Sequence, residues 1–197
     1  MEYLVSSDLP EILETLAELK GRAKLIAGGT NVIPDLGAGR IAPELIIHLG
    51  ALEGLDRIRE ADGFISLGAL TTISVTASSK VIRKGCPILS SAAGLLGSPL
   101  TRNRATIAGN LADASPAADL APPLLALEAS IHTERSGGRG RKIPMDRFFV
   151  GPNKTLLEAD EVITMIGFPK PKDPATGSHI KLGLRNAMAI SVGSIAL

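Results

Sequence analysis

The sequence has one cysteine, Cys86, no tryptophan, one tyrosine and four phenylalanines among its 197 residues. A single thiol excludes an internal disulfide framework, a CxxC zinc site and an internal iron–sulfur cluster, because each needs several thiolates. The scarcity of aromatic side chains argues against a base-stacking surface. A formal net charge of +1 argues against the basic face that binds nucleic acid. We therefore expect no nucleic-acid partner.

Long apolar runs and a signal peptide are also missing. No run approaches the roughly 20 residues that cross a bilayer, so no membrane span is expected. The opening MEYLVSSDLP lacks the basic and apolar regions of a secretory signal, which predicts a cytoplasmic protein. Glycine (21 residues) and proline (13 residues), by contrast, are abundant. They predict many loops in which the backbone carries recognition.

The hydrophobic pattern alternates helices and strands in the first fifty residues. A capping box at residues 8–11, followed by apolar residues at helical spacing, predicts a helix that stops at Gly21. Short buried strands are predicted over 24–27 and 45–49, so this part favours an α/β layer. Further strands are predicted over 64–67, 130–133, 141–143, 162–166 and 190–197. Mixed helical signals fill 71–96, and the end of a short helix is expected at 124–127. A loop is predicted over 172–177. Residues 97–123 show no strong period, and a structureless stretch of that length is usually either functional or a sign that its helices or strands have been missed.

The first candidate site follows a buried strand that runs directly into Gly28 and Gly29, then Thr30 and Asn31. Two glycines at a strand end let the backbone turn sharply and approach a ligand closely. Consecutive amides in such a turn bind anions, and the two polar side chains add hydrogen bonds without charge. The alternative is an ordinary tight turn. The GxGxxA pattern at residues 37–42 lacks the flanking strand and helix of a dinucleotide fingerprint and is interpreted as a surface loop.

The second candidate site is the segment from Thr106 to Asn110, which again combines small residues with an amide and a hydroxyl. If it converges with the first turn, two neutral loops could bind a pyrophosphate through main-chain N–H groups. Asp113 and Asp119 would repel a bare phosphate but could accept hydrogen bonds from sugar or ribityl hydroxyls. The alternative is a helix cap at Asp119 together with ordinary turns.

These two motifs, with residues 97–99 before the second and 114–122 after it, resemble the FAD-binding subunits of the molybdenum hydroxylases, the family of xanthine dehydrogenase and the aerobic carbon monoxide dehydrogenase medium subunit. The resemblance covers essentially the whole chain in order. It implies an α+β, FAD-binding PCMH-type fold of the vanillyl-alcohol-oxidase kind. Two α/β subdomains, residues 1–55 and 56–170, would enclose FAD. Residues 178–197 would begin a third domain, which in the family usually continues for about a hundred further residues, so the chain is expected to be truncated.

By the resemblance, the cofactor-binding residues come from both motifs and from two later segments. The motifs would enclose the pyrophosphate from opposite sides, the aspartates would face the ribityl and phosphate region, and the later residues would align with flavin-contacting positions. The implied set is Leu25, Ile26, Ala27, Gly28, Gly29, Thr30, Asn31, Val32, Thr106, Ile107, Ala108, Gly109, Asn110, Asp113, Asp119, Ile163 and Lys181. The family often has two glycines where this chain has Ala108 and Gly109, and the extra methyl limits how closely the backbone approaches.

The resemblance also implies an electron-transfer subunit without a catalytic residue or metal ligand of its own, because FAD carries the redox chemistry. A molybdopterin-binding large subunit would oxidise the substrate, and a small subunit would pass electrons through two [2Fe–2S] clusters to FAD. NAD⁺ or another acceptor would then receive them. Two alternatives stay open. One is a stand-alone flavin oxidoreductase of the same fold, and the other is a non-catalytic truncated remnant that acts as an interaction module.

The remaining reactive residues are scattered along the chain. The three histidines lack metal-ligand spacing; His48 is expected in the core, and His132 and His179 in surface segments. Cys86 is interpreted as a packing residue. The cationic side chains between residues 135 and 142 are typical either of a surface that docks a partner or an anion, or of a solvated hairpin.

Overall fold

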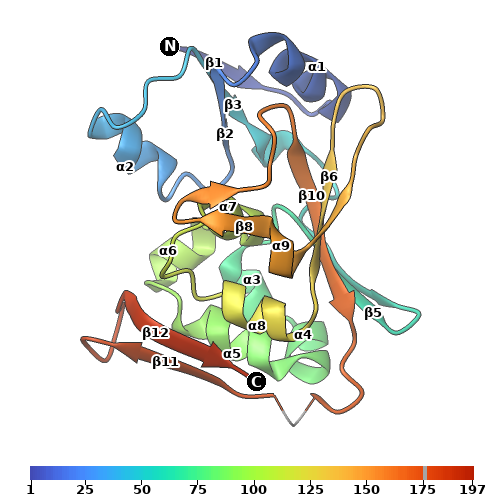
Figure 1. Ribbon diagram of the computed structural model, residues 1–197, viewed down its shortest axis with the longest axis vertical. Helices are drawn as coiled ribbons and strands as arrows, with labels where there is room; N and C mark the ends of the chain where they lie inside the picture. The colour runs from blue at the N-terminus through green and yellow to red at the C-terminus, as the bar shows by residue number, and fades with distance from the viewer. Residues whose placement is uncertain (175–176) are drawn as a thin grey trace.

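The computed structural model describes residues 1–174 and 177–197, and it has a mixed α+β architecture (Figure 1). Its N-terminal part is a three-stranded parallel sheet in the order β1-β3-β2. The strands are β1 (Glu2–Val5), β2 (Ala23–Ile26) and β3 (Leu45–His48). α1 (Leu9–Leu19) connects β1 to β2, and its apolar stripe packs on the sheet because leucine and isoleucine recur at helical spacing.

Two short helices flank the end of this sheet. α2 (Val32–Gly37) follows the glycine turn after β2, and the 3₁₀ helix η1 (Leu49–Ala51) follows β3. The residues after α2, up to residue 42, form a largely exposed turn, as the surface-loop interpretation of the GxGxxA pattern predicts. The glycine turn therefore emerges from an edge strand of the sheet, where its backbone is open to one side.

The second sheet has five antiparallel strands in the order β4-β5-β10-β6-β7. Its strands are β4 (Ile58–Ala61), β5 (Phe64–Gly68), β6 (Ser130–Glu134), β7 (Lys142–Pro144) and β10 (Val162–Pro169). β10 is central, and six of its eight residues are buried, as expected for a strand that is covered on both faces. Val162, at the start of β10, packs into the core of the N-terminal sheet, so this strand joins the two sheets.

A layer of short helices covers the antiparallel sheet and shares its hydrophobic core. These helices are α3 (Ile73–Ser78), α4 (Lys80–Gly85), α5 (Pro87–Leu95), α6 (Pro99–Arg104), α7 (Ile107–Asp113) and α8 (Ala121–Ala126). Hydroxyl side chains begin four of them by accepting a hydrogen bond from a backbone amide, namely Thr72, Ser79, Ser98 and Thr106. Each of these caps fixes the residue at which its helix begins.

Two hairpins complete the described chain. α9 (Met145–Phe148) leads into β8 (Phe149–Gly151) and β9 (Lys154–Thr155), whose turn reaches the end of α7. β11 (His179–Gly183) pairs with β12 (Ser191–Ala196) at the other end of the molecule, and this C-terminal hairpin lies against α5 and α8 (Figure 1). Among the described residues, no helix is both long and apolar enough to cross a membrane.

The sequence predicts most strands and the first helix correctly, and the hairpin of β6 and β7 is present. The capping box at residues 8–11 does not form, since the Asp8 side chain makes no capping hydrogen bond. Of the two interpretations of residues 97–123, the one in which helices or strands had been missed is correct, because α6, α7 and the start of α8 occupy this stretch. Its small residues give too weak a hydrophobic period to reveal those helices. Residues 175 and 176 of the predicted 172–177 loop lie outside the described ranges.

Candidate functional site

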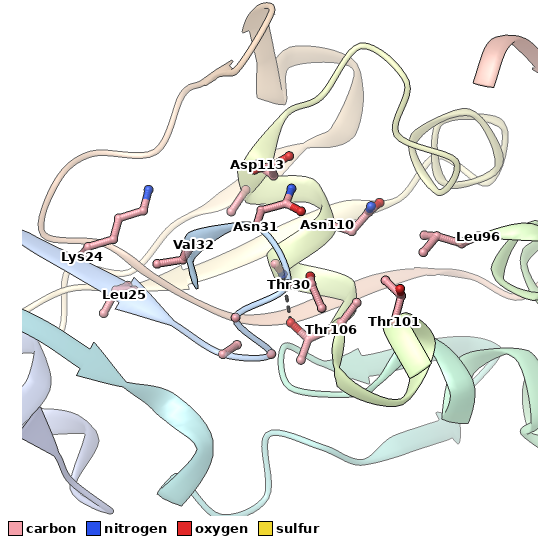
Figure 2. Close-up of a pocket in the computed structure, with 16 residues that line it drawn as sticks. Lys24, Leu25, Thr30, Asn31, Val32, Leu96, Thr101, Thr106, Asn110 and Asp113 are labelled. Atoms are coloured by element: carbon pink, nitrogen blue, oxygen red, sulfur yellow. Dashed lines mark hydrogen bonds between the residues drawn. The ribbon is translucent and has the colours of Figure 1, made fainter. Parts of the chain in front are cut away.

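A cleft of about 200 Å³ lies between the glycine turn after β2 and one face of α7 (Figure 2). It brings together the two sequence motifs, which are about eighty residues apart in the chain. Its walls are Lys24, Leu25, Ala27, Gly28, Gly29, Thr30, Asn31, Val32, Leu96, Thr101, Ala105, Thr106, Gly109, Asn110, Ala112 and Asp113. The lining is mostly small and uncharged, and five of its residues carry a hydroxyl or amide side chain, which suits a ligand that is recognised by backbone and amide groups.

The glycine turn is held against the connection between α6 and α7. A methyl group placed on Gly28 would overlap the carbonyl group of Arg104 and approach the Cα of Ala105, so no side chain fits at this position. Gly29 has a φ of +72°, which glycine adopts without strain. The two glycines therefore have separate roles: the first allows backbone-to-backbone contact, and the second allows the sharp turn.

The amides of this turn are available to a ligand. None of the N–H groups from Gly28 to Val32 donates a hydrogen bond to another described residue, and the Thr30 and Asn31 side chains also make none. The carbonyl of Gly29, by contrast, accepts from the Ile33 amide at 3.1 Å, which fixes the turn at the start of α2. A run of unpaired amides on a fixed turn forms a nest that attracts anions.

The second motif contributes a helix face and not a loop. Thr106, Gly109, Asn110 and Asp113 follow helical spacing and face the cleft, whereas Ile107 and its neighbours in the core face away. Thr106 caps α7, because its Oγ1 accepts from the Gly109 amide at 3.1 Å, the bond drawn in Figure 2. This geometry explains why the motif combines a hydroxyl with a glycine three residues later.

The main-chain amides at this end of α7 are already paired within the protein. The Ile107 amide donates to the Thr71 carbonyl at 2.9 Å, and the Ala108 amide donates to the Ala69 carbonyl at 3.3 Å. The Asn110 amide donates to the Thr106 carbonyl at 3.0 Å. The structure therefore does not support a second set of free amides, and α7 offers the cleft side chains instead.

One of those side chains has an unused hydrogen-bonding atom. The Oδ1 atom of Asn110 is buried and has no partner among the described residues. A buried polar atom without a partner costs about 1–3 kcal/mol. Such a cost is commonly offset when a ligand supplies the missing donor, as a hydroxyl group would.

A smaller, mainly apolar cavity of about 100 Å³ adjoins the cleft and shares Leu25, Ala27, Thr106, Gly109 and Ala112 with it. Ile163 of β10 lines this second cavity together with Leu49, Ala69, Leu70, Ala108, Ala112, Leu157 and Glu161. The two spaces form a polar compartment beside an apolar one. That combination fits a ligand with both a charged linker and a flat, apolar ring.

Asp119 and Lys181, also predicted to bind the cofactor, lie together in a different place. The Lys181 Nζ donates to Asp119 Oδ2 at 2.7 Å and to the Leu95 carbonyl at 3.2 Å, and both charged side chains are 7% exposed. This buried ion pair fastens the C-terminal hairpin to α5. Leu95, whose carbonyl accepts from Lys181, is followed in the chain by Leu96, which lines the cleft. The second oxygen of Asp119 is buried without a partner.

Four of the predicted residues do not line the main cleft because their side chains belong to the cores. Ile26 is 6% exposed and Ile107 is fully buried. Ala108 is 8% exposed and Ile163 is 6% exposed, and both border only the smaller cavity. Sequence reasoning missed five residues of the lining, which are Lys24, Leu96, Thr101, Ala105 and Ala112. Two of them could have been found, because Ala105 and Ala112 lie within or beside the second motif.

The cationic side chains between residues 135 and 142 are partly neutralised. Arg135 pairs with Asp160 at 2.7 Å, and Arg141 pairs with Glu161 at 2.6 Å. Burial alone would raise the pKa of the Glu161 carboxyl, but hydrogen bonds from Arg141, the Glu158 amide and Thr133 lower it overall. This network closes the wall of the apolar cavity and favours the solvated-hairpin interpretation over a docking surface.

No acid–base or metal constellation appears among residues 1–174 and 177–197. Those residues contain no group of three or more histidine, cysteine, aspartate or glutamate side chains that could hold a metal ion. Burial lowers the pKa of His132, with help from Lys142, and burial raises the pKa of the Cys86 thiol to about 11. A thiol with that pKa is a poor nucleophile near neutral pH.

Comparisons with known proteins find a family of FAD-binding domains. The family described as "FAD binding domain in molybdopterin dehydrogenase" matches residues 1–171. The chain is 35% identical over 168 residues to the carbon monoxide dehydrogenase medium chain of Hydrogenophaga pseudoflava, covering 85% of this chain and 58% of that protein. It is 32% identical over 191 residues to the xanthine dehydrogenase FAD-binding subunit of Escherichia coli O157:H7, covering 96% of this chain and 65% of the other.

The fold comparison gives the same result. A solved structure of the Hydrogenophaga pseudoflava carbon monoxide dehydrogenase, in a form that lacks the Mo-pyranopterin moiety, superposes with a TM-score of 0.93 and 32% identity. The superposition covers 100% of this chain and 68% of the other. The α+β fold predicted from the resemblance is thereby confirmed. The chain spans about three-fifths of the length of the two curated relatives named above.

Proposed function

Because the chain belongs to the family of FAD-binding domains of molybdopterin dehydrogenases, we propose that its cleft holds FAD and that it acts as the electron-transfer subunit of a molybdenum hydroxylase. A molybdopterin-binding large subunit would oxidise the substrate. A small subunit with two [2Fe–2S] clusters would deliver electrons to this subunit, and NAD⁺ or another acceptor would receive them. The relatives that are themselves described as medium chains or FAD-binding subunits support this role.

The diphosphate of the cofactor would lie on the glycine turn. The unpaired amides from Gly28 to Val32 supply hydrogen-bond donors and partial positive charge without adding a formal charge. Gly28 lets the turn pack against the α6–α7 connection and Gly29 lets the backbone turn sharply, so the two glycines fix these amides beside the cleft. This run of free amides in a neutral cleft is the observation that carries the proposal.

α7 would position the cofactor by side chains from the opposite wall. The orphaned Oδ1 of Asn110 needs a donor, and a ribose or ribityl hydroxyl provides one. Asp113 would accept a hydrogen bond from another hydroxyl. Thr106 would keep α7 in register through its cap. The residues present therefore fit FAD in both polarity and hydrogen-bonding capacity.

The apolar cavity would take a flat ring of the cofactor, and the adenine is the ring that fits its small volume. Ile163 and Leu25 would exclude water from the ring faces. The isoalloxazine ring supplies the redox chemistry when the cofactor is bound. We place it towards Leu96, where the Asp119–Lys181 pair offers a buried charge and an unpaired carboxylate oxygen near the end of the cleft.

We also propose that the chain is organised as residues 1–55, 56–170 and 178–197. The parallel sheet lies within the first range, the antiparallel sheet lies within the second, and the C-terminal hairpin lies within the third. The proposed cofactor site then lies between the first two parts, with each part contributing one wall.

Equilibrium dialysis with FAD, followed by flavin absorbance, tests this function. The purified chain should retain FAD, and Gly109→Asp should weaken binding by about tenfold or more, because it adds a carboxylate to the wall that faces the diphosphate. Gly94→Asp controls for the added charge, since Gly94 is also an exposed helical glycine but lies outside the cleft. Gly109→Ala controls for the added Cβ, which would lie 2.9 Å from Thr106 Oγ1. Gly29→Asp should also weaken binding, but its φ of +72° adds backbone strain.

Two results would contradict the proposal. A folded parent chain that takes up no FAD would remove the function altogether. Equal affinities of the parent and the Gly109→Asp variant would show that FAD lies elsewhere. Thermal unfolding of each variant, measured in parallel without FAD, separates a loss of binding from a loss of fold.

A further inference from the structure

The charges in the cleft are few and unequally placed. Among the described residues of its lining, only Lys24 and Asp113 carry a formal charge. Asp113 lies on α7, where its carboxylate would oppose a phosphate. Lys24 lies in β2, a short distance before the glycine turn, and Figure 2 shows its amine extended beside Val32.

Lys24 also differs from the neighbouring cations in having no partner. Its Nζ makes no hydrogen bond or ion pair with any residue in the described ranges. Arg22, two residues earlier, is paired with Glu44 at 2.6 Å, and Lys181 is paired with Asp119 at 2.7 Å. Arg102, beside the cleft, donates to the Leu96 and Gly97 carbonyls. Lys24 is the one cation among the described residues of the cleft lining itself.

We propose that Lys24 is a specificity-determining residue of the cofactor site that recognises the negative charge of the diphosphate. The inference rests on the proposed function. The glycine-turn amides bind an anion by geometry, but they carry only partial charge and they face the opposing carboxylate of Asp113. A mobile ammonium at the rim offsets that carboxylate and adds a charge-assisted hydrogen bond to a phosphate oxygen.

The charge of Lys24 makes FAD binding dependent on salt. An exposed ion pair is screened as ionic strength rises, whereas hydrogen bonds from backbone amides are affected much less. FAD affinity should therefore fall between low and high NaCl in the parent chain. Riboflavin, which lacks both phosphates, should bind with an affinity that neither salt nor Lys24 alters.

The test compares Lys24→Met, Lys24→Arg and Lys80→Met by equilibrium dialysis at two salt concentrations. Methionine keeps the length of the side chain without its charge, so Lys24→Met should bind FAD about fivefold more weakly at low salt and lose most of the salt dependence. Lys24→Arg should bind within about twofold of the parent. Lys80→Met is the matched control, because Lys80 is an exposed lysine of α4 outside the cleft.

The outcomes separate this inference from the function on which it rests. If the parent chain and all variants bind FAD equally, with one common salt dependence, FAD binding stands and the role of Lys24 is refuted. If Lys24→Met weakens riboflavin binding as much as FAD binding, the side chain acts by packing, and the inference is also refuted. If the parent binds no FAD at all, the proposed function and the inference fail together.

Discussion

Replacing Gly28 by alanine would show whether the glycine turn and the α6–α7 connection must touch backbone to backbone. The added methyl would fall well inside 3.0 Å of the Arg104 carbonyl group and reach the Cα of Ala105 at 3.0 Å. Packed neighbours yield by only a few tenths of an ångström, and backbone atoms cannot rotate away as a side chain can. The turn must therefore separate from α7, and we expect the free energy of unfolding to fall by about 1–3 kcal/mol, the usual range for overpacking.

The separation should also weaken FAD binding, because the two walls of the cleft move apart. A displacement on the order of 1 Å can cost up to a hundredfold in a positioned site, and we expect at least a tenfold loss of affinity. Urea denaturation measures the stability change, and equilibrium dialysis measures the affinity. Gly37→Ala is the control, because Gly37 ends α2 with no heavy atom within 4 Å of the added methyl. It should be neutral or stabilise by up to about 1 kcal/mol.

If Gly28→Ala unfolded at the same urea concentration as the parent and bound FAD equally well, the turn could not be packed against Arg104 as described. The reasoning about the shared cleft would then be wrong. A loss of stability with unchanged FAD affinity would instead show that the contact supports the fold but does not set the width of the cofactor site.

Two further predictions concern single buried polar groups. Asn110→Leu should raise the free energy of unfolding of the FAD-free chain by about 1 kcal/mol, since it removes a buried oxygen that has no partner among the described residues. It should also lower FAD affinity. Urea denaturation and dialysis measure the two quantities, and the reasoning is wrong if stability and affinity change in the same direction. Glu161→Gln should lower that free energy by about 2 kcal/mol near neutral pH, because it weakens the charged hydrogen bonds from Arg141. Folding lowers the pKa of Glu161 from 4.5, so this stabilisation exists above pH 4.5 and disappears as pH falls through the lower, folded value. The free energies of unfolding of the two proteins should therefore converge in strong acid. A constant difference between them at all pH values would contradict this reasoning.

The first motif could be predicted from sequence because its structure is local. A short apolar run that stops at two glycines indicates a strand that ends in a turn, whatever the rest of the chain does. The polar residues Thr30 and Asn31 then mark the turn as a candidate site. What the sequence could not show is the reason for Gly28, since its partner, the Arg104 carbonyl, lies far along the chain and is a backbone group.

The second motif lines the same cleft as the first, as its prediction as a converging motif requires, but it forms a helix and not a loop. α7 is only seven residues long, and its buried positions include an alanine, so the hydrophobic period is weak. The helix could have been recognised from the hydroxyl of Thr106, followed by a glycine three residues later and by apolar residues at positions 107 and 111. The spacing of Thr106, Asn110 and Asp113 then places these side chains on one face, whichever ligand binds.

The contacts that sequence reasoning could not reach are long-range pairs. Arg141 and Glu161 are 20 residues apart and meet only because β6, β7 and β10 share a sheet. Asp119 and Lys181 meet across 62 residues, so their burial as an ion pair follows from the packing of the C-terminal hairpin. The same reasoning applies to Lys24, which in the sequence is an ordinary charged residue of a short strand. Only the structure shows that it lines the cleft and has no partner among the described residues.

The hydrogen bonds within the two walls indicate that each wall would bind the cofactor through a different kind of group. On the α7 side, the amides from 107 to 110 are used by the protein itself, so this wall can position a ligand only through side chains. On the opposite side, the amides from 28 to 32 have no partner among the described residues, so this wall can hold a diphosphate through its backbone, with the Lys24 side chain at the rim. Substitutions on the α7 wall should therefore change affinity in proportion to the side-chain chemistry that they remove. Substitutions in the glycine turn should act mainly through backbone shape, and Lys24, at the rim, is the position where charge alone should matter.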